Sequence, residues 1–130
     1  MSPVDERRRI SSGSPFEGTI GFSRALRAGD RVLVSGTAPV VPGGNCPEGA
    51  GPQAERCFDI IEAALAEAGA SLDDVVRTRT YLTSAEDAAA VGAVHGARLA
   101  HVRPAATMVV VAALLDPAWK VEIEAEAVLP

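Results

Sequence analysis

The 130-residue chain has few aromatic side chains, with three Phe, one Trp and one Tyr. Valine, alanine, leucine and isoleucine must therefore fill the interior. The chain also has no run of about 18 apolar residues, so we expect no membrane-spanning helix. The N-terminal MSPVDERRRI lacks the apolar segment of a secretory signal, which favours a cytoplasmic protein.

Positive charge, thiols and histidines are also scarce. The net charge is −5, and Arg7–Arg9 is the one basic cluster, so we expect no nucleic-acid partner. The two cysteines, Cys46 and Cys57, cannot build a disulfide framework; we expect a reduced protein with Cys57 as a small apolar residue on a helix. His95 and His101 lack the neighbours that a metal site requires, so we expect neither metal nor cofactor.

The residues that are present predict one domain over residues 1–130, with a frayed tail at Met1–Glu6. An apolar content of 48% supplies one core, since a chain of this length buries roughly two-thirds of its unfolded surface. Hydrophobic periodicity predicts two helices, at 53–68 and 84–100. It predicts strands at 7–11, 22–28, 31–35, 75–83, 107–112 and 120–128.

Turn and cap residues support these boundaries. Gly29-Asp30 separates two apolar runs and predicts a type II′ hairpin turn. Pro52 and Gly69 suit the first turn and the C-cap of the first helix, and Ser84 suits the N-cap of the second. The Gly- and Pro-rich segment 36–52 is either a functional loop or a plain surface connection.

The last predicted strand alternates strictly, with Glu122, Glu124 and Glu126 on one face and apolar residues on the other. The strand predicted at 75–83 places Arg77, Arg79 and Tyr81 on one face and Val76, Thr78, Thr80 and Leu82 on the other. We expect the arginines to partner the acids. The order of elements predicts an α+β fold, in which two helices cover one face of a mixed six-stranded sheet.

Four short motifs occur in a particular order: Gly21-Phe22-Ser23-Arg24-Ala25, Val34-Ser35-Gly36-Thr37-Ala38-Pro39, Pro104-Ala105-Ala106-Thr107 and Val121-Glu122-Ile123-Glu124-Ala125. Their order and spacing resemble the RidA (YjgF) family over residues 7–129. The resemblance implies the chorismate-mutase-like fold of that family. It also implies a homotrimer with small-molecule pockets in the clefts between subunits, and hydrolytic deamination of imines without a cofactor.

The resemblance also assigns roles to residues. Glu122 matches the family glutamate thought to position or activate the hydrolytic water, and a carboxylate near apolar walls suits a general base. The implied substrate-binding positions are Phe22, Arg24, Ser35, Gly36, Thr37, Ala106 and Thr107.

Three positions depart from the family pattern. Ala106 stands where imine-hydrolysing members carry the arginine that clamps the substrate carboxylate. Phe22 replaces a frequent Tyr of the family, and Gly92 aligns with a family Asn. These changes predict a less polar or uncharged ligand, unless Arg24 or Arg103 replaces the missing arginine.

Three functions follow, in decreasing order of support. The first is hydrolysis of an imine- or enamine-type metabolite other than a simple 2-imino acid. The second is a non-catalytic trimer of the same fold that binds a small ligand. The third, an endoribonuclease, is disfavoured by the net charge of −5.

Overall fold

The computed structural model describes residues 7–130, so the predicted tail at Met1–Glu6 lies outside the described residues. The strands are β1 (Arg8–Ile10), β2 (Ala25–Ala28), β3 (Arg31–Thr37), β4 (Val75–Leu82), β5 (Ala105–Val110) and β6 (Val121–Val128). The helices are α1 (Ala50–Glu67) and α2 (Ala88–Leu99), with short turns η2 (Glu17–Gly21), η3 (Leu72–Asp74) and η4 (Ala85–Asp87).

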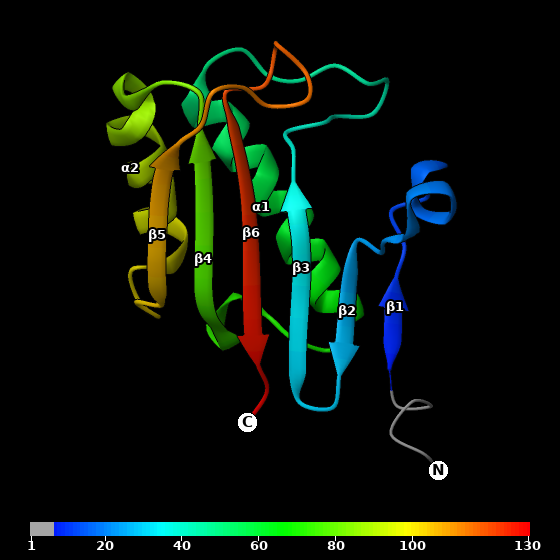
Figure 1. Cartoon of the computed structure of the whole chain (residues 1–130). Coiled ribbons are helices and arrows are strands. Elements are labelled where there is room, and N and C mark those ends of the chain that lie inside the picture. The colour runs from blue at the N-terminus through cyan, green and yellow to red at the C-terminus, as the bar shows by residue number, and fades with distance from the viewer. Residues whose placement is uncertain (1–6) are drawn as a thin grey trace.

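The six strands form one mixed sheet in the order β1-β2-β3-β6-β4-β5. Only β4 and β5 pair in parallel; the other neighbours are antiparallel. Helices α1 and α2 both lie behind the sheet in Figure 1 and leave its front face uncovered. The predicted α+β architecture is therefore confirmed, and β6 lies at the centre of the sheet.

The core lies between β6, its neighbours and α1. Val121 and Ile123 of β6 are 0% exposed, as the strict alternation of this strand predicted. Phe58 and Ile61 of α1 pack into the same core, at 1% and 0% exposure. Burying each of these large side chains stabilises the fold by roughly 1.5–3 kcal/mol. The acids of β6 consequently point to the uncovered face.

The predicted hairpin joins β2 to β3. Ala28 pairs with Arg31, which leaves a two-residue turn. Gly29 has a φ of +63°, whereas Asp30 is not among the residues with positive φ. A single positive φ at the first turn residue fits type II′ rather than type I′. The turn fixes every cross-strand pair of the hairpin, including Leu26 with Leu33.

Element boundaries differ from the predictions at several ends. Helix α1 begins at Ala50 rather than residue 53, so Pro52 lies in its first turn, and Gly69 follows it with a φ of +86°. Ser84 caps the turn η4 by accepting a 3.3 Å hydrogen bond from Glu86 N, and α2 continues from η4. The segment 12–21 contains the π-helical turn η2, and strand β2 begins at Ala25 rather than at the predicted residue 22.

The predicted faces of strand β4 were wrong at one position, Val76. Val75 and Arg77 of β4 pair with the adjacent residues Ala127 and Glu126, so Val76 is an extra, bulged residue. Val76 is consequently 45% exposed, whereas Val75 is 2% exposed.

The long loops before α1 and before β6 are fastened by Gln53, which is only 1% exposed. Its Nε2 donates to Pro47 O at 3.0 Å and to Ala118 O at 2.9 Å, while its Oε1 accepts from Lys120 N at 2.7 Å. This single side chain therefore holds the segment that leads into β6. Within residues 7–130, no helix is long and apolar enough to cross a bilayer.

Candidate functional site

A bulge in β3 organises the candidate site. Val34 pairs with Ala125 and Thr37 with Ile123, so three steps along β3 match two along β6. The extra residue turns Gly36 toward Glu122. A Cβ built on Gly36 would lie 2.7 Å from Glu122 Oε2, which is closer than real Cβ contacts. Glycine at this position therefore makes room for the Glu122 carboxylate.

Arg24 fastens the bulge from the neighbouring chain segment. Its Nη2 donates to Ser35 O at 2.7 Å and to Gly36 O at 2.6 Å. Ser35 Oγ in turn donates to Ser23 O at 2.7 Å, and Ser35 N donates to Arg24 O at 3.0 Å. Both carbonyls of the bulge, which lack a regular ladder partner, thus receive a charge-assisted hydrogen bond.

Glu122 is half-buried, and its carboxylate accepts no hydrogen bond from residues 7–130. Burial raises the pKa of Glu122, because a charged carboxylate loses hydration there. The positive charge of Arg24 opposes this rise in pKa, and the negative charge of Glu124 adds to it. A carboxylate with a raised pKa and free lone pairs is a stronger general base than an ordinary carboxylate.

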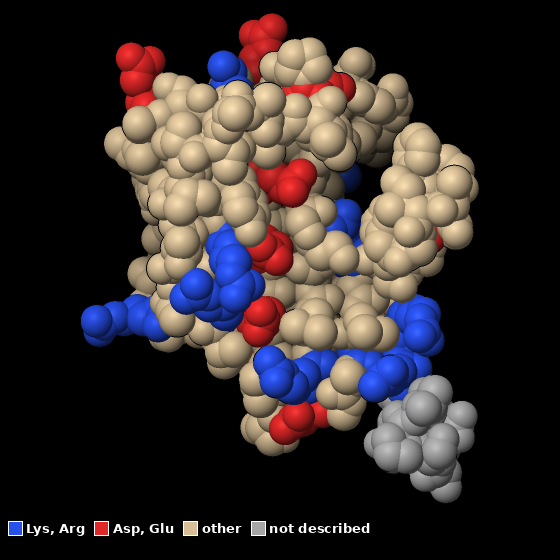
Figure 2. Space-filling model, viewed as in Figure 1, with Lys and Arg blue, Asp and Glu red and all other residues tan. Residues whose placement is uncertain are grey.

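The other two acids of β6 are partnered within the sheet. Arg79 Nη1 and Arg31 Nη2 lie 3.1 Å and 3.5 Å from the Glu126 carboxylate. Tyr81 OH donates to Glu124. Figure 2 shows acidic atoms running down the middle of the uncovered face with arginine atoms beside the lower ones. The expectation that arginines partner the acids is thus confirmed at Glu126, whereas Glu122 stays without such a partner among the described residues.

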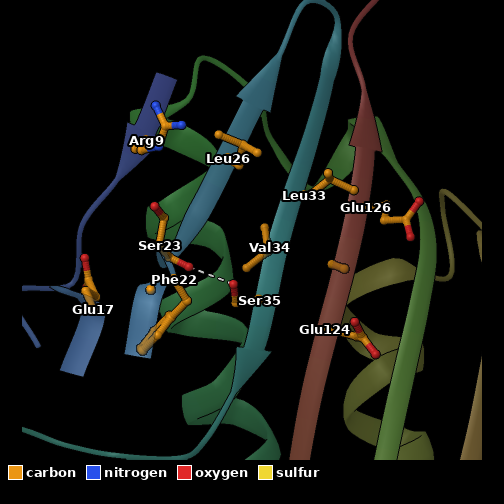
Figure 3. Close-up of a pocket in the computed structure, with 12 residues that line it drawn as sticks. Arg9, Glu17, Phe22, Ser23, Leu26, Leu33, Val34, Ser35, Glu124 and Glu126 are labelled. Atoms are coloured by element: carbon orange, nitrogen blue, oxygen red, sulfur yellow. Dashed lines mark hydrogen bonds between the residues drawn. The ribbon is translucent and has the colours of Figure 1, made fainter. Parts of the chain in front are cut away.

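An open cavity of about 660 Å³ lies beside this arrangement on the uncovered face. Phe22, Leu26 and Leu33 give it an apolar wall, and Glu124 lies on its opposite side (Figure 3). Two implied binding residues, Phe22 and Ser35, line this cavity, but Arg24, Gly36 and Thr37 do not. Glu122 is two residues along β6 from Glu124, on the same face and beyond the cavity lining.

Thr37 lies beneath the bulge, not on its surface. It is 0% exposed, and its hydroxyl donates to Ser35 O at 2.8 Å. The Cys57 thiol reaches Thr37 O at 3.2 Å, and burial raises the pKa of Cys57 to about 12. Cys57 is therefore a protonated core residue, as the sequence predicted, and Cys46 is a free thiol in the loop.

Ala106 and Thr107 lie far from Glu122 within one chain. Glu122 pairs with Tyr81, which pairs with Val109 of β5, so Ala106 is two strands across and three residues along. Strand geometry converts this into about 14 Å between Ala106 and Glu122. Thr78 is buried on the helix-covered face of the sheet, and Ala106 is its partner on β5. Paired residues share a face, so Ala106 faces the side opposite Glu122. Thr107 accepts a 2.8 Å hydrogen bond from Arg77.

Arg24 and Arg103, the two candidate replacements for a clamp at residue 106, are placed differently. The Nη2 group of Arg24 is engaged by the bulge. Arg103 precedes β5 with a φ of +54°, six residues from Val109 and hence about 20 Å along the strand direction. Gly92 lies on α2, behind the sheet. Neither arginine therefore supplies a replacement carboxylate clamp beside Glu122 within one chain.

Comparison with known proteins adds to this geometry. The family model described as "Endoribonuclease L-PSP" matches residues 14–129. The crystal structure of Rv2704 from Mycobacterium tuberculosis, described as a member of the YjgF/YER057c/UK114 family, has a TM-score of 0.88 and 42% identity, covering 95% of this chain and 100% of that one. The chain belongs to the RidA/YjgF family.

Two further proteins are similar to this chain over most of their length. An uncharacterized protein of Streptomyces coelicolor is 40% identical over 123 residues, covering 92% of this chain and 90% of that protein. The structure of RidA from an Antarctic Psychrobacter species is 33% identical with a TM-score of 0.80, covering 93% and 94% of the two chains. The RidA/YjgF assignment made from four short motifs is therefore confirmed.

Sequence reasoning missed several residues around the cavity. Leu26 and Leu33 were recoverable, because a two-residue turn at Gly29-Asp30 dictates their pairing. Glu17 was not recoverable. Its carboxylate accepts a hydrogen bond from Ser12 N at 2.7 Å, which folds the 12–21 segment back on itself, and no periodic pattern marks such a contact.

Proposed function

We propose that this RidA/YjgF member hydrolyses the C=N bond of an uncharged imine, or of the imine tautomer of an enamine, and releases ammonia. The observation that carries the proposal is the Glu122 carboxylate, which lies half-buried against Gly36 with a raised pKa and no hydrogen-bond donor among residues 7–130. A structural acid at this position would be expected to have a partner, as Glu126 has.

The proposed reaction is balanced without a cofactor. Glu122 accepts a proton from a water molecule as the water oxygen bonds to the imine carbon. The proton then passes to the nitrogen of the tetrahedral adduct. The adduct then gives its hydroxyl proton to the nitrogen by way of Glu122 as the C–N bond breaks, so ammonia leaves and a carbonyl product remains. Such general-base assistance contributes roughly 10²- to 10⁴-fold in rate.

We further propose that the working form is a cytoplasmic homotrimer with its sites in clefts between subunits. The split of the implied binding residues supports this arrangement. Arg24, Ser35 and Gly36 gather at Glu122, whereas Ala106 and Thr107 lie on the exposed edge strand β5. A second subunit that brings its β5 to the bulge would complete one site.

The preference for an uncharged substrate follows from the arginines. Ala106 carries no guanidinium, Arg24 is engaged by the bulge, and Arg103 lies at the far end of β5. Losing a charge-assisted contact to a carboxylate typically costs about 1.5–3 kcal/mol. Simple 2-imino acids should therefore be poor substrates.

Ammonia release from benzophenone imine, an uncharged ketimine without a carboxylate, tests the proposed reaction. The native protein should accelerate release, and Glu122→Gln should lose at least about a hundredfold of that acceleration. Glu124→Gln, which changes the neighbouring acid on the same face, should retain most of it. Equal rates for native protein and Glu122→Gln would refute the hydrolase proposal.

The alternative function is a non-catalytic small-ligand binder, and the loss of the clamp at Ala106 favours it specifically. A binder should show saturable association with the same probe but no ammonia release, and Glu122→Gln should change only its affinity. An endoribonuclease should instead bind RNA with steep salt dependence, which the net charge of −5 disfavours.

A further inference from the structure

We infer that Arg24 is the positioning residue for the Glu122 carboxylate and not a substrate clamp. The inference rests on the proposed function for its catalytic meaning, but the contacts that support it belong to the folded chain alone. Three links connect the two residues: the hydrogen bonds of Arg24 to the bulge, the placement of Gly36 by that bulge, and the contact of Gly36 with Glu122.

The first link is the use made of the guanidinium. A planar guanidinium binds a carboxylate through two neighbouring nitrogens. The pair is either Nε with Nη2 or Nη1 with Nη2, so both pairs include Nη2. In this chain Nη2 donates to Ser35 O and Gly36 O at 2.7 and 2.6 Å, which occupies both of its hydrogens. Nε is enclosed and has no partner within residues 7–130. Neither pair is therefore free to bind a carboxylate.

The second link is the bulge itself. The carbonyls of Ser35 and Gly36 sit where β3 departs from its regular register with β6. A single charged nitrogen that bonds both carbonyls fixes their relative orientation. Hydrogen bonds with one charged partner are stronger than neutral ones, so these two hold the carbonyls firmly. Without them, we expect the Gly36 backbone to shift while the flanking ladder pairs persist.

The third link is the fit between Gly36 and Glu122. The position of a Gly36 Cβ lies 2.7 Å from Glu122 Oε2 and 3.3 Å from Glu122 Cδ. The carboxylate therefore rests directly against the glycine backbone, and a movement of Gly36 is a movement of the wall behind it. A displacement of about 1 Å at a reacting group can cost roughly a hundredfold in rate.

The charge of Arg24 acts on the same carboxylate. Four charged or titratable groups surround Glu122. They are Arg24 beside β2, Glu124 on β6, Cys57 on α1, and Tyr81 on β4, which is the strand partner of Glu122. Among residues 7–130, Arg24 is the one cation that lowers the pKa of Glu122, while burial and Glu124 raise it. Removing the guanidinium should thus raise the pKa of Glu122 further.

Arg27 provides a matched control, because it lies on β2, three residues after Arg24. Its guanidinium also bonds two backbone carbonyls, with Nε donating to Gly29 O at 3.0 Å and Nη1 to Ala68 O at 2.8 Å. It does not contribute to the pKa of Glu122. Arg27→Gln therefore removes an equally anchored arginine without touching the bulge.

The test is carboxyl ¹³C NMR of the full-length protein, with the Glu122 signal assigned by its loss in Glu122→Gln. In Arg24→Gln the Glu122 signal should titrate at higher pH than in the native protein, and the Gly36 amide signal should move. In Arg24→Lys the amide signal should still move while the titration changes less, because lysine keeps the charge but not the fork. Arg27→Gln should change neither signal.

Gly36→Ala supplies a second route that leaves Arg24 intact. Its methyl group should displace the carboxylate, so the Glu122 signal should move and release of ammonia from benzophenone imine should fall at least about tenfold. For Arg24→Lys the same assay should show a lower kcat with little change in KM, whereas a substrate clamp would raise KM. An unchanged Glu122 titration and Gly36 amide signal in the Arg24 variants would overturn the inference.

These outcomes separate the inference from the proposed function. NMR shifts as described, with no imine turnover in the native protein, would refute the hydrolase and keep the positioning role. Turnover by the native protein, with unchanged NMR signals in both Arg24 variants, would keep the hydrolase and refute the positioning role. Global unfolding of both Arg24 variants, with Arg27→Gln folded, would show a general stabilising role and also overturn the inference.

Discussion

Glu122→Gln is expected to make the protein less active but more stable at neutral pH. Burial raises the pKa of Glu122 in the folded chain, while the unfolded carboxyl titrates near ~4.3. Between these two pKa values the folded chain binds more protons than the unfolded chain. The free energy of unfolding therefore falls as the pH rises through this window. At pH values above this window, ionised Glu122 consequently destabilises the fold.

The size of the gain follows from the surroundings of the carboxylate. It accepts no hydrogen bond from residues 7–130, but Arg24 offsets part of its desolvation and solvent reaches part of its surface. We therefore expect a gain of about 1 kcal/mol, inside the ~0.5–2 kcal/mol typical of relieving a strained functional position. For a domain of this length, that corresponds to a Tm higher by about 4 °C.

Thermal unfolding at two pH values measures this effect. At about pH 7 the variant should melt higher, and below about pH 4 the difference should vanish because both states are then protonated. All samples need one protein concentration, since the Tm of an oligomer depends on it. Glu126→Gln is the control: it removes a carboxylate paired with Arg79 and Arg31, so it should lose stability at about pH 7. A Glu122→Gln variant that is less stable than the native protein at neutral pH would refute the reasoning.

Two other predictions concern the frame of the site. Gln53→Ala should destabilise the fold by ~3 kcal/mol, because the backbone groups of Pro47, Ala118 and Lys120 lose their hydrogen-bond partner. Denaturant titration measures this loss, and an unchanged midpoint would contradict the role of Gln53. A thiol reagent should modify Cys46 in the native protein and Cys57 only after unfolding, because Cys57 is 0% exposed with a pKa raised to about 12. Equal reaction rates for the two thiols would show that the core around Cys57 opens readily.

The regular parts of the fold were predictable because the sequence repeats a period there. The alternation of Glu122 and its neighbours identified β6 and both of its faces, and Gly29-Asp30 identified the hairpin with its turn type. Helix ends were less exact. The predicted start of the first helix was Gln53, whereas the buried face of α1 already begins at Ala50.

The irregular parts carry the candidate site and were not predictable in detail. Each bulge inserts one residue, and a broken alternation in a short strand looks the same as the end of that strand. The bulge at Val76 was therefore missed, and so was the one at Ser35 and Gly36. Family resemblance located Gly36 and Glu122 along the chain, but their contact depends on how β3 and β6 come into register.

Ammonia release from 2-imino acids, generated in solution by an amino-acid oxidase, is the most direct test of the account. We propose that Glu122 still activates water in this RidA/YjgF chain, whereas Ala106 cannot bind a substrate carboxylate. The native protein should be nearly inactive on these substrates, and Ala106→Arg should gain at least about tenfold, the lower end of what a charge-assisted contact supplies. Native activity that equals the activity of Ala106→Arg would contradict the claim.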